Sequence, residues 1–104
     1  MKRQSFFDEL LELRQMLLNL GERVEIAIHQ SVLSLADLNR QQAEDVIVKD
    51  VEIDDLEEHI GDTVTKLIAT QQPVAKDLRR IITAITIASD MERMGDLAKN
   101  IARI

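Results

Sequence analysis

Hydrophobic residues recur along the chain in alternating steps of three and four positions, the spacing of one face of an α-helix. The first such stripe consists of Phe6, Leu10, Leu13, Leu17, Leu20, Val24 and Ala27. Its expected start is Ser5, whose hydroxyl can cap free backbone amides. Further apolar residues widen the stripe, namely Leu11, Leu18, Ile28 and Leu35. We therefore predict a helix over about residues 5–36 that contacts more than one neighbour.

Two more stripes follow after short connections. Asn39 and Gln42 have the spacing of a capping box, and the second stripe then contains Ala43, Val46, Ile53, Ile60, Val64 and Leu67. Pro73 suits the first turn of a third helix, where no amide donor is needed. The third stripe contains Val74, Leu78, Ile81, Ile82, Ile85, Ala88, Met91, Leu97 and Ile101. The predicted helices cover about residues 40–70 and 73–104.

The connections are so short that consecutive helices must pack antiparallel. Each helix of about 30 residues would be about 45 Å long at 1.5 Å per residue. With 104 residues, two aromatic residues, three glycines and one proline, the chain has few turn formers and an aliphatic core. The predicted fold is all-α, an antiparallel three-helix bundle with long helices, forming a single domain over residues 1–104.

Composition narrows the functional classes. The chain has no cysteine, and therefore neither a disulfide framework nor a thiolate metal site. No uncharged run approaches the length of a membrane-spanning helix. A net charge of −6 with so few aromatic residues argues against nucleic acid as a partner. We expect a cytoplasmic protein that meets a membrane only through its partners.

Acidic residues interrupt the apolar stripes at two places. Asp50 lies between Val46 and Ile53, where the apolar period would have continued, and Asp54 follows four residues later on the same face. Glu92 and Asp96 repeat this spacing on the third helix. Residues equidistant from the turn at Pro73 lie at one level of an antiparallel hairpin. Asp54 should therefore face Glu92, and Asp50 should face Asp96.

Four carboxylates that converge in this way repel one another unless they are compensated. A cation with a preference for oxygen ligands could bind them. Arg93, Lys49 or Lys99 could instead neutralise them, or the cluster could be solvated. The residue pattern leaves these three alternatives open.

We find no catalytic apparatus in the sequence. His29 and His59 are the only histidines. A ferritin-like di-iron site requires Glu-x-x-His, but Leu56 stands three residues before His59. There is no glycine-rich phosphate loop and no triad-like set of residues. We predict that the protein is not an enzyme; a metal-storage bundle, a metal-dependent enzyme or a purely structural bundle remain alternatives.

Three segments resemble the PhoU family of phosphate-signalling regulators. The segment from Leu67 to Arg79 resembles the turn between the second and third helices of that family. The segment DMERMGDLAKNI at residues 90–101 resembles its third-helix signature, and DVEIDDLE at residues 50–57 resembles its acidic motif. The resemblance covers essentially the whole chain, which corresponds to one PhoU-like repeat.

The resemblance implies a function. Members of the family restrain phosphate uptake by the phosphate ABC transporter and silence the associated sensor kinase when phosphate is plentiful. Their acidic motifs can bind iron or other metals, such as Mn, Ni, Mg or Zn. Carried over to this chain, the metal ligands would be Asp50, Asp54, Glu92, Asp96 and, one turn further, Asn100.

The family has two tandem three-helix repeats, whereas this chain has one. It would be either a fragment of a longer protein or a single-repeat member that pairs with a second copy. Because apolar residues on the first helix extend beyond one stripe, we expect a homodimer or a larger oligomer.

Overall fold

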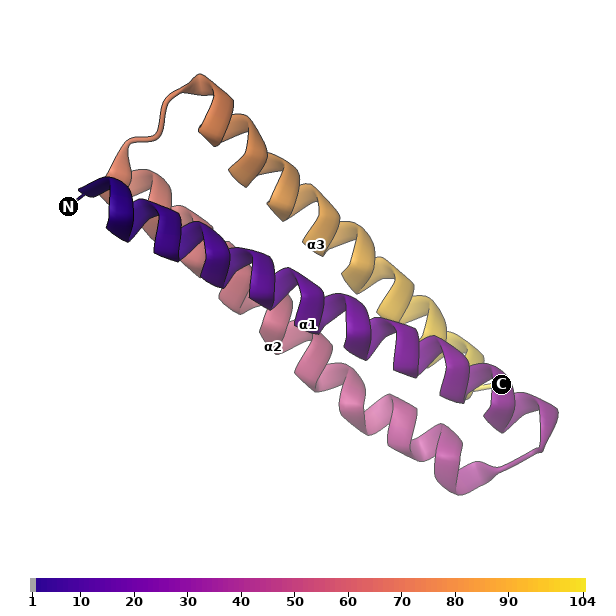
Figure 1. The fold of residues 1–104 in the computed structure, drawn as a ribbon. Coiled ribbons are helices and arrows are strands. Elements are labelled where there is room, and N and C mark those ends of the chain that lie inside the picture. The colour runs from indigo at the N-terminus through magenta and orange to yellow at the C-terminus, as the bar shows by residue number, and fades with distance from the viewer. Residues whose placement is uncertain (1) are drawn as a thin grey trace.

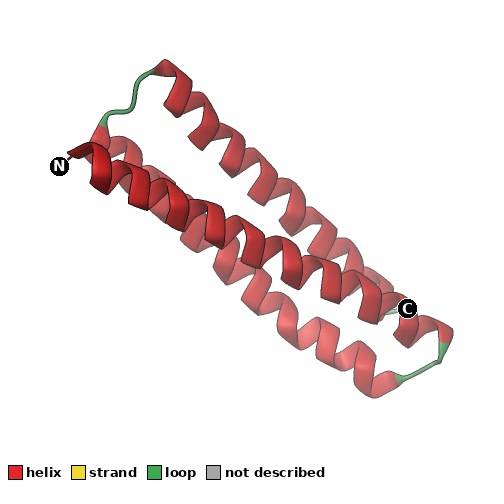
Figure 2. Ribbon diagram, viewed as in Figure 1, coloured by secondary structure: helices red, strands yellow, loops and turns green. Residues whose placement is uncertain are grey.

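The computed structural model describes residues 2–104, with side chains from residue 5 onward. The chain forms three helices, α1 (Lys2–Ala36), α2 (Arg40–Gln71) and α3 (Ala75–Ala102). They run up, down and up beside one another, as Figure 1 shows, and each packs against both of the others. Figure 2 shows that only short loops join them, and residues 2–104 contain no strand. The predicted all-α antiparallel bundle is confirmed, as a rod 54 Å long and 19 Å by 16 Å across.

The first connection contains one of the two hydrogen bonds of the predicted capping box, while the Asn39 N–H donates to the carbonyl oxygen of Ser34 instead. Asn39 has an extended backbone, and its side-chain oxygen accepts a hydrogen bond of 3.0 Å from the backbone N–H of Gln42. This bond satisfies one of the amide donors that every helix start leaves free. The preceding residue, Leu38, adopts a φ of 52° and is almost fully exposed. The turn is therefore fixed by Asn39 and strained at Leu38.

Two predicted helix starts are wrong. α1 begins at Lys2, so Ser5 lies inside the helix and caps nothing. α3 begins at Ala75, with Val74 as its cap residue, so Pro73 precedes the helix rather than lying in its first turn. The reason is at Gln72, which closes α2 in the left-handed conformation with a φ of 44°. Pro73 and Val74 are then needed to carry the chain across to α3.

The core is aliphatic and runs the length of the rod. The buried residues of α1 and α2 follow the predicted stripes, and those of α3 are mostly small. They are Leu13, Leu20, Val24, Ala27, Val46, Ile53, Ile60, Val64, Leu67, Ile81, Ala84, Ala88, Ala98 and Ala102. Burial of this apolar surface is the main force that holds the three helices together.

The predicted core face of α3 is wrong in part. Ile82, Ile85 and Leu97 are exposed, Leu97 to 61%. Their places in the core are taken by alanines and by Gly95, which follow the same three-and-four spacing one position away. Two adjacent faces of α3 are apolar, so periodicity alone could not choose between them. The face with small side chains is the one that lets α3 approach α1 and α2 closely.

None of the described helices is long and apolar enough to cross a membrane.

Candidate metal site between the second and third helices

Asp50 lies in the buried stripe of α2, in a position that an apolar residue would normally fill. Its neighbours in the stripe, Val46 and Ile53, are both buried, and Asp50 itself is only 2% exposed. A carboxylate is rarely buried to this extent without a partner, because it loses its hydration. The predicted interruption of the core by acid is therefore real, and it is located at Asp50.

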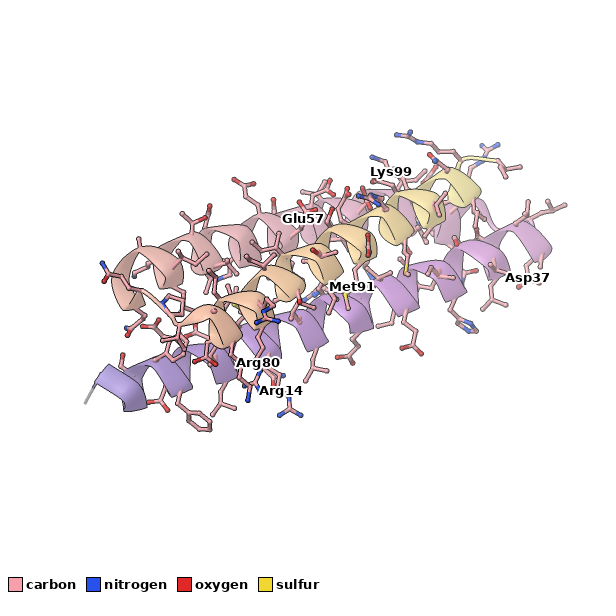
Figure 3. All side chains as sticks on the ribbon, turned by 90° about the horizontal axis from the view of Figure 1, so that it is seen from above. Arg14, Asp37, Glu57, Arg80, Met91 and Lys99 are labelled. Carbon is pink, nitrogen blue, oxygen red and sulfur yellow. The ribbon has the colours of Figure 1, made fainter. Side chains whose placement is uncertain are left out.

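The structure brings three of the predicted carboxylates together. Asp50 and Asp54 from α2 and Asp96 from α3 each offer an oxygen, and these oxygens lie within 4.8 Å of one another. Asp54 and Asp96 are exposed, so the cluster opens to solvent on one side while Asp50 closes the other. Figure 3 shows the side of the bundle on which α2 and α3 meet, with Glu57 and Lys99 labelled along it.

Lys99 is the cation that compensates Asp50. Its ammonium nitrogen lies 3.5 Å from Asp50 Oδ2, and its side chain is largely covered by the bundle. Of the other two cations considered, Arg93 pairs with Asp90 on its own helix. Lys49 makes no ion pair with any residue that the structure describes. The lysine that pairs with the cluster is thus the one on the facing helix, one turn beyond Asp96, and it contacts Asp50.

One oxygen of Asp50 remains without a partner. Oδ1 is fully buried and accepts no hydrogen bond from any described residue, although Oδ2 pairs with Lys99. Burial raises the pKa of this carboxyl group, and repulsion from Asp54 and Asp96 raises it further, against the opposing effect of Lys99. Lys99 therefore offsets only part of the unfavourable environment of the Asp50 carboxylate.

Glu92 extends the cluster toward the turn. Burial, together with hydrogen bonding to Asp96 and Asp54, raises the pKa of Glu92 to about 7. Glu92 therefore shares a proton with its neighbours near neutral pH. The facing pairs, Asp54 with Glu92 and Asp50 with Asp96, are those expected from their distances to Pro73.

Two residues at the margin of the cluster differ from the predicted set. Asn100 is exposed one turn beyond Asp96, and nothing in the structure joins it to the carboxylates. Glu57 was not predicted, yet its charge contributes to the raised pKa of Glu92. Its position three residues after Asp54 was the available signal, because residues at that spacing share a helical face.

Gly95 allows the two helices to approach each other at this level. A Cβ atom there would lie 3.2 Å from Ile53 Cγ2, 3.3 Å from Ile53 Cδ1 and 3.5 Å from Asp50 Oδ1. The first two distances are tighter than most real Cβ contacts. The absence of a side chain at Gly95 therefore brings the backbone of α3 close to Asp50.

The residues present fit a metal ion. The donor set is made of carboxylate oxygens from two helices, which suits Mg²⁺, Mn²⁺, Ca²⁺ or iron. The unpartnered Oδ1 of Asp50 has unused capacity as an acceptor, and a cation would offset the mutual repulsion of the group. Asp50, Asp54 and Asp96 would hold such an ion.

The chain is similar in sequence to a family of known proteins. Residues 17–104 match the PhoU domain family. A protein of Clostridium acetobutylicum named phosphate-specific transport system accessory protein PhoU homolog is 42% identical over 104 residues, or 99% of this chain and 48% of its own length. Homologs of the same name from Streptococcus pneumoniae and Aquifex aeolicus are 40% and 42% identical, over 97% and 92% of this chain and 47% and 43% of theirs. The chain spans about half the length of the curated relatives that it matches.

Proposed function

The chain belongs to the PhoU domain family, and we propose that it is a regulatory module of phosphate homeostasis whose acidic cluster binds a metal ion. In this proposal it restrains phosphate uptake and phosphate-starvation signalling by contact with other proteins. Its partners are components of a phosphate ABC transporter and the associated sensor kinase. It acts in the cytoplasm and reaches the membrane through these partners.

Similarity to named relatives carries the regulatory part of the proposal. The relatives that match nearly all of this chain are called accessory proteins of phosphate-specific transport systems. These names refer to a transport system and to no reaction, which supports regulation over catalysis.

The buried carboxylate of Asp50 carries the metal-binding part. A single surface acid would need no ligand, but Asp50 is buried beside two other carboxylates and keeps one oxygen without a partner. A cation bound there would join α2 to α3 by ligands from both. Binding of iron, manganese or another divalent ion could thereby set the stability and spacing of these two helices.

Deletion of the gene in its host tests the regulatory proposal. We expect a reporter of phosphate-starvation genes to be expressed in phosphate-rich medium in the deletion strain and to be repressed again when the wild-type gene is restored. The Asp50→Asn/Asp96→Asn variant should restore repression poorly if the metal is required, whereas Glu58→Gln, at an exposed acid outside the cluster, should restore it fully. A reporter that stays repressed in the deletion strain would contradict the regulatory role.

We also propose that the chain self-associates. α1 exposes large apolar side chains, among them Leu11, Leu18 and Leu35, that no other part of the described structure covers. Exposed apolar surface of this extent favours association.

A further inference from the structure

α1 carries a second stripe of regularly spaced residues outside the core. We call it the outer stripe; it alternates steps of four and three along nearly the whole helix. Its members are Phe7, Leu11, Arg14, Leu18, Gly21, Glu25, Ile28, Val32 and Leu35. The six large apolar residues among them are between 37% and 57% exposed. This spacing is that of a coiled-coil seam, which needs a partner helix to cover it.

The outer stripe borders a groove between α1 and α3. The groove has a volume of about 570 Å³, and apolar side chains from both helices dominate its lining, including Ile28, Val32, Met91 and Met94. Figure 3 shows Met91 where α3 faces α1. Methionine side chains adapt readily to an incoming surface. A helix from a partner could therefore pack into this groove beside α1.

The outer stripe contains two charged residues of opposite sign. Arg14 and Glu25 are both exposed, and neither forms an ion pair with another described residue. They stand 11 positions apart, too far to pair with each other along one helix. They can therefore form ion pairs with a partner that has an acidic residue opposite Arg14 and a basic residue opposite Glu25.

We propose that a second copy of this chain packs its own α1 antiparallel along the outer stripe. In an antiparallel pair of identical helices, each residue of one copy faces one residue of the other. The numbers of the two facing residues add up to the same value at every level of the seam. A sum of 39 places Arg14 opposite Glu25 of the second copy, and Glu25 opposite the second Arg14. The same register places Leu11 opposite Ile28, Leu18 opposite Gly21 and Phe7 opposite Val32. All these layers are related by one two-fold axis.

The charges exclude the other simple arrangements. A parallel pair would place Arg14 against Arg14 and Glu25 against Glu25, which is repulsive at both levels. An antiparallel pair shifted by one heptad would set Arg14 opposite Val32 and Glu25 opposite Gly21. Both charges would then lose water without gaining a partner. Only the register in which facing residue numbers add up to 39 pairs Arg14 with Glu25, and the two-fold symmetry forms this pair twice.

Gly21 supports the same register. Its added Cβ would lie 3.4 Å from the methyl group of Met91, a flexible side chain, so the packing of the bundle does not require glycine there. Glycine inside a helix is less favourable than alanine. A residue without a side chain places no side-chain atom of its own opposite Leu18 of the second copy, and its nearest neighbour there is the flexible side chain of Met91.

This inference gives the self-association proposed above a surface and a geometry, and it is independent of the regulatory role. The test uses the chain itself in sedimentation velocity over about 1–100 μM. We expect a dimer that Arg14→Glu or Glu25→Arg weakens at least about tenfold, because each change places like charges at both levels. The exchanged variant, Arg14→Glu with Glu25→Arg, should recover the wild-type dissociation constant. Arg79→Glu, an exposed reversal on α3, should change nothing.

The possible results distinguish self-association itself from the surface proposed for it. A wild type that stays monomeric at 100 μM would overturn both self-association and the proposed surface, and would mean that something else covers the outer stripe. A dimer that ignores the charge reversals, or that the exchanged variant fails to restore, would overturn the surface while leaving self-association intact. All positions changed are exposed, and circular dichroism would verify that each variant remains helical.

Cross-linking gives a second reading of the register. The chain has no cysteine of its own, so introduced thiols report only on their own position. Leu11→Cys with Ile28→Cys should form a covalent dimer on mild oxidation, because each thiol faces the other type across the seam. Either single variant should stay monomeric under denaturing, non-reducing conditions. Efficient cross-linking by a single variant would indicate a parallel pair and contradict the proposal.

Discussion

Two carboxyl groups in the acidic cluster behave differently although they are neighbours. Asp50 is buried and pairs with Lys99, so its charge is partly compensated at the cost of its hydration. Glu92 has no such cation and relieves the repulsion by holding a proton, with a pKa of about 7 against its ordinary 4.5. A site in which one carboxyl group still holds a proton near neutral pH can gain a cation by releasing that proton.

The raised pKa of Glu92 makes the stability of the metal-free bundle depend on pH. Between about pH 4.5 and 7 the folded protein keeps on Glu92 a proton that the unfolded chain has lost, so the contribution of Glu92 to stability is greatest below this range and falls as the pH rises through it. With a chelator present, we expect a loss of roughly 2 kcal/mol in the free energy of unfolding across this range, less than the full shift implies because Glu92 is partly solvated.

The control for this prediction is a comparison of slopes. Glu92→Gln cannot titrate, so its denaturant midpoint should depend less on pH than that of the wild type. Glu58→Gln removes an exposed acid and should keep the wild-type slope. Equal slopes in wild type and Glu92→Gln would show that Glu92 does not hold the proton.

For single residues, the sequence predicts which acidic side chains lie close together but not which cation pairs with them. The spacing of Asp50, Asp54, Glu92 and Asp96 about Pro73 was sufficient to bring them together, because an antiparallel hairpin permits little freedom of register. The choice of Lys99 over Lys49 and Arg93 depends on side-chain direction across two helices. That direction follows from the packing of α3, which the apolar pattern left ambiguous.

Helix α3 determines how closely the bundle can pack around the site. Its buried face consists largely of alanine and Gly95, whereas larger residues such as Ile82 and Leu97 point outward. Small residues on a helix face allow a short interaxial distance, which brings the backbone of α3 close to Asp50. The element with the weakest apolar stripe is therefore the one that shapes the site.

Adding one methyl group at two glycines should have opposite effects. At Gly95 a Cβ would press against Ile53, so Gly95→Ala should destabilise the bundle by about 1–3 kcal/mol. At Gly61 nothing lies within 4 Å of the added Cβ, so Gly61→Ala should stabilise by about 0.5–1 kcal/mol through helix propensity. Urea denaturation measures both. A Gly95→Ala variant as stable as Gly61→Ala would show that the helices are not in close contact at this level.

The helices themselves could be predicted from the sequence to within a few residues at each end. Asn39 was recognised because its side chain and spacing match a known cap, and the structure contains that hydrogen bond. The start assigned to Ser5 was wrong because α1 already begins at Lys2, and a good capping residue can also lie inside a helix. Pro73 lies before α3 because it belongs to the turn between the two helices. The turn before α3 depends on the conformation of Gln72, which no local pattern revealed.

The whole molecule is a slender rod whose core runs along its axis and whose acidic cluster lies between two of its three helices. A cation held by α2 and α3 together would bind the folded form and not the separated helices. It would therefore stabilise the entire bundle by mass action, by about 2.7 kcal/mol at a hundred times its dissociation constant. For a domain of this size that corresponds to a rise in melting temperature of about 10 °C or more.

The most direct test of the account is the melting temperature of the chain with and without Fe²⁺, Mn²⁺ or Ni²⁺, compared between wild type and Asp50→Asn/Asp96→Asn. We expect at least one of these ions to raise the melting temperature of the wild type and of the Glu58→Gln control. The double variant should lose most of that rise and should melt higher than the wild type without metal, because repulsion has been removed. An equal rise in wild type and double variant, or no rise with any ion, would contradict a metal site at this cluster.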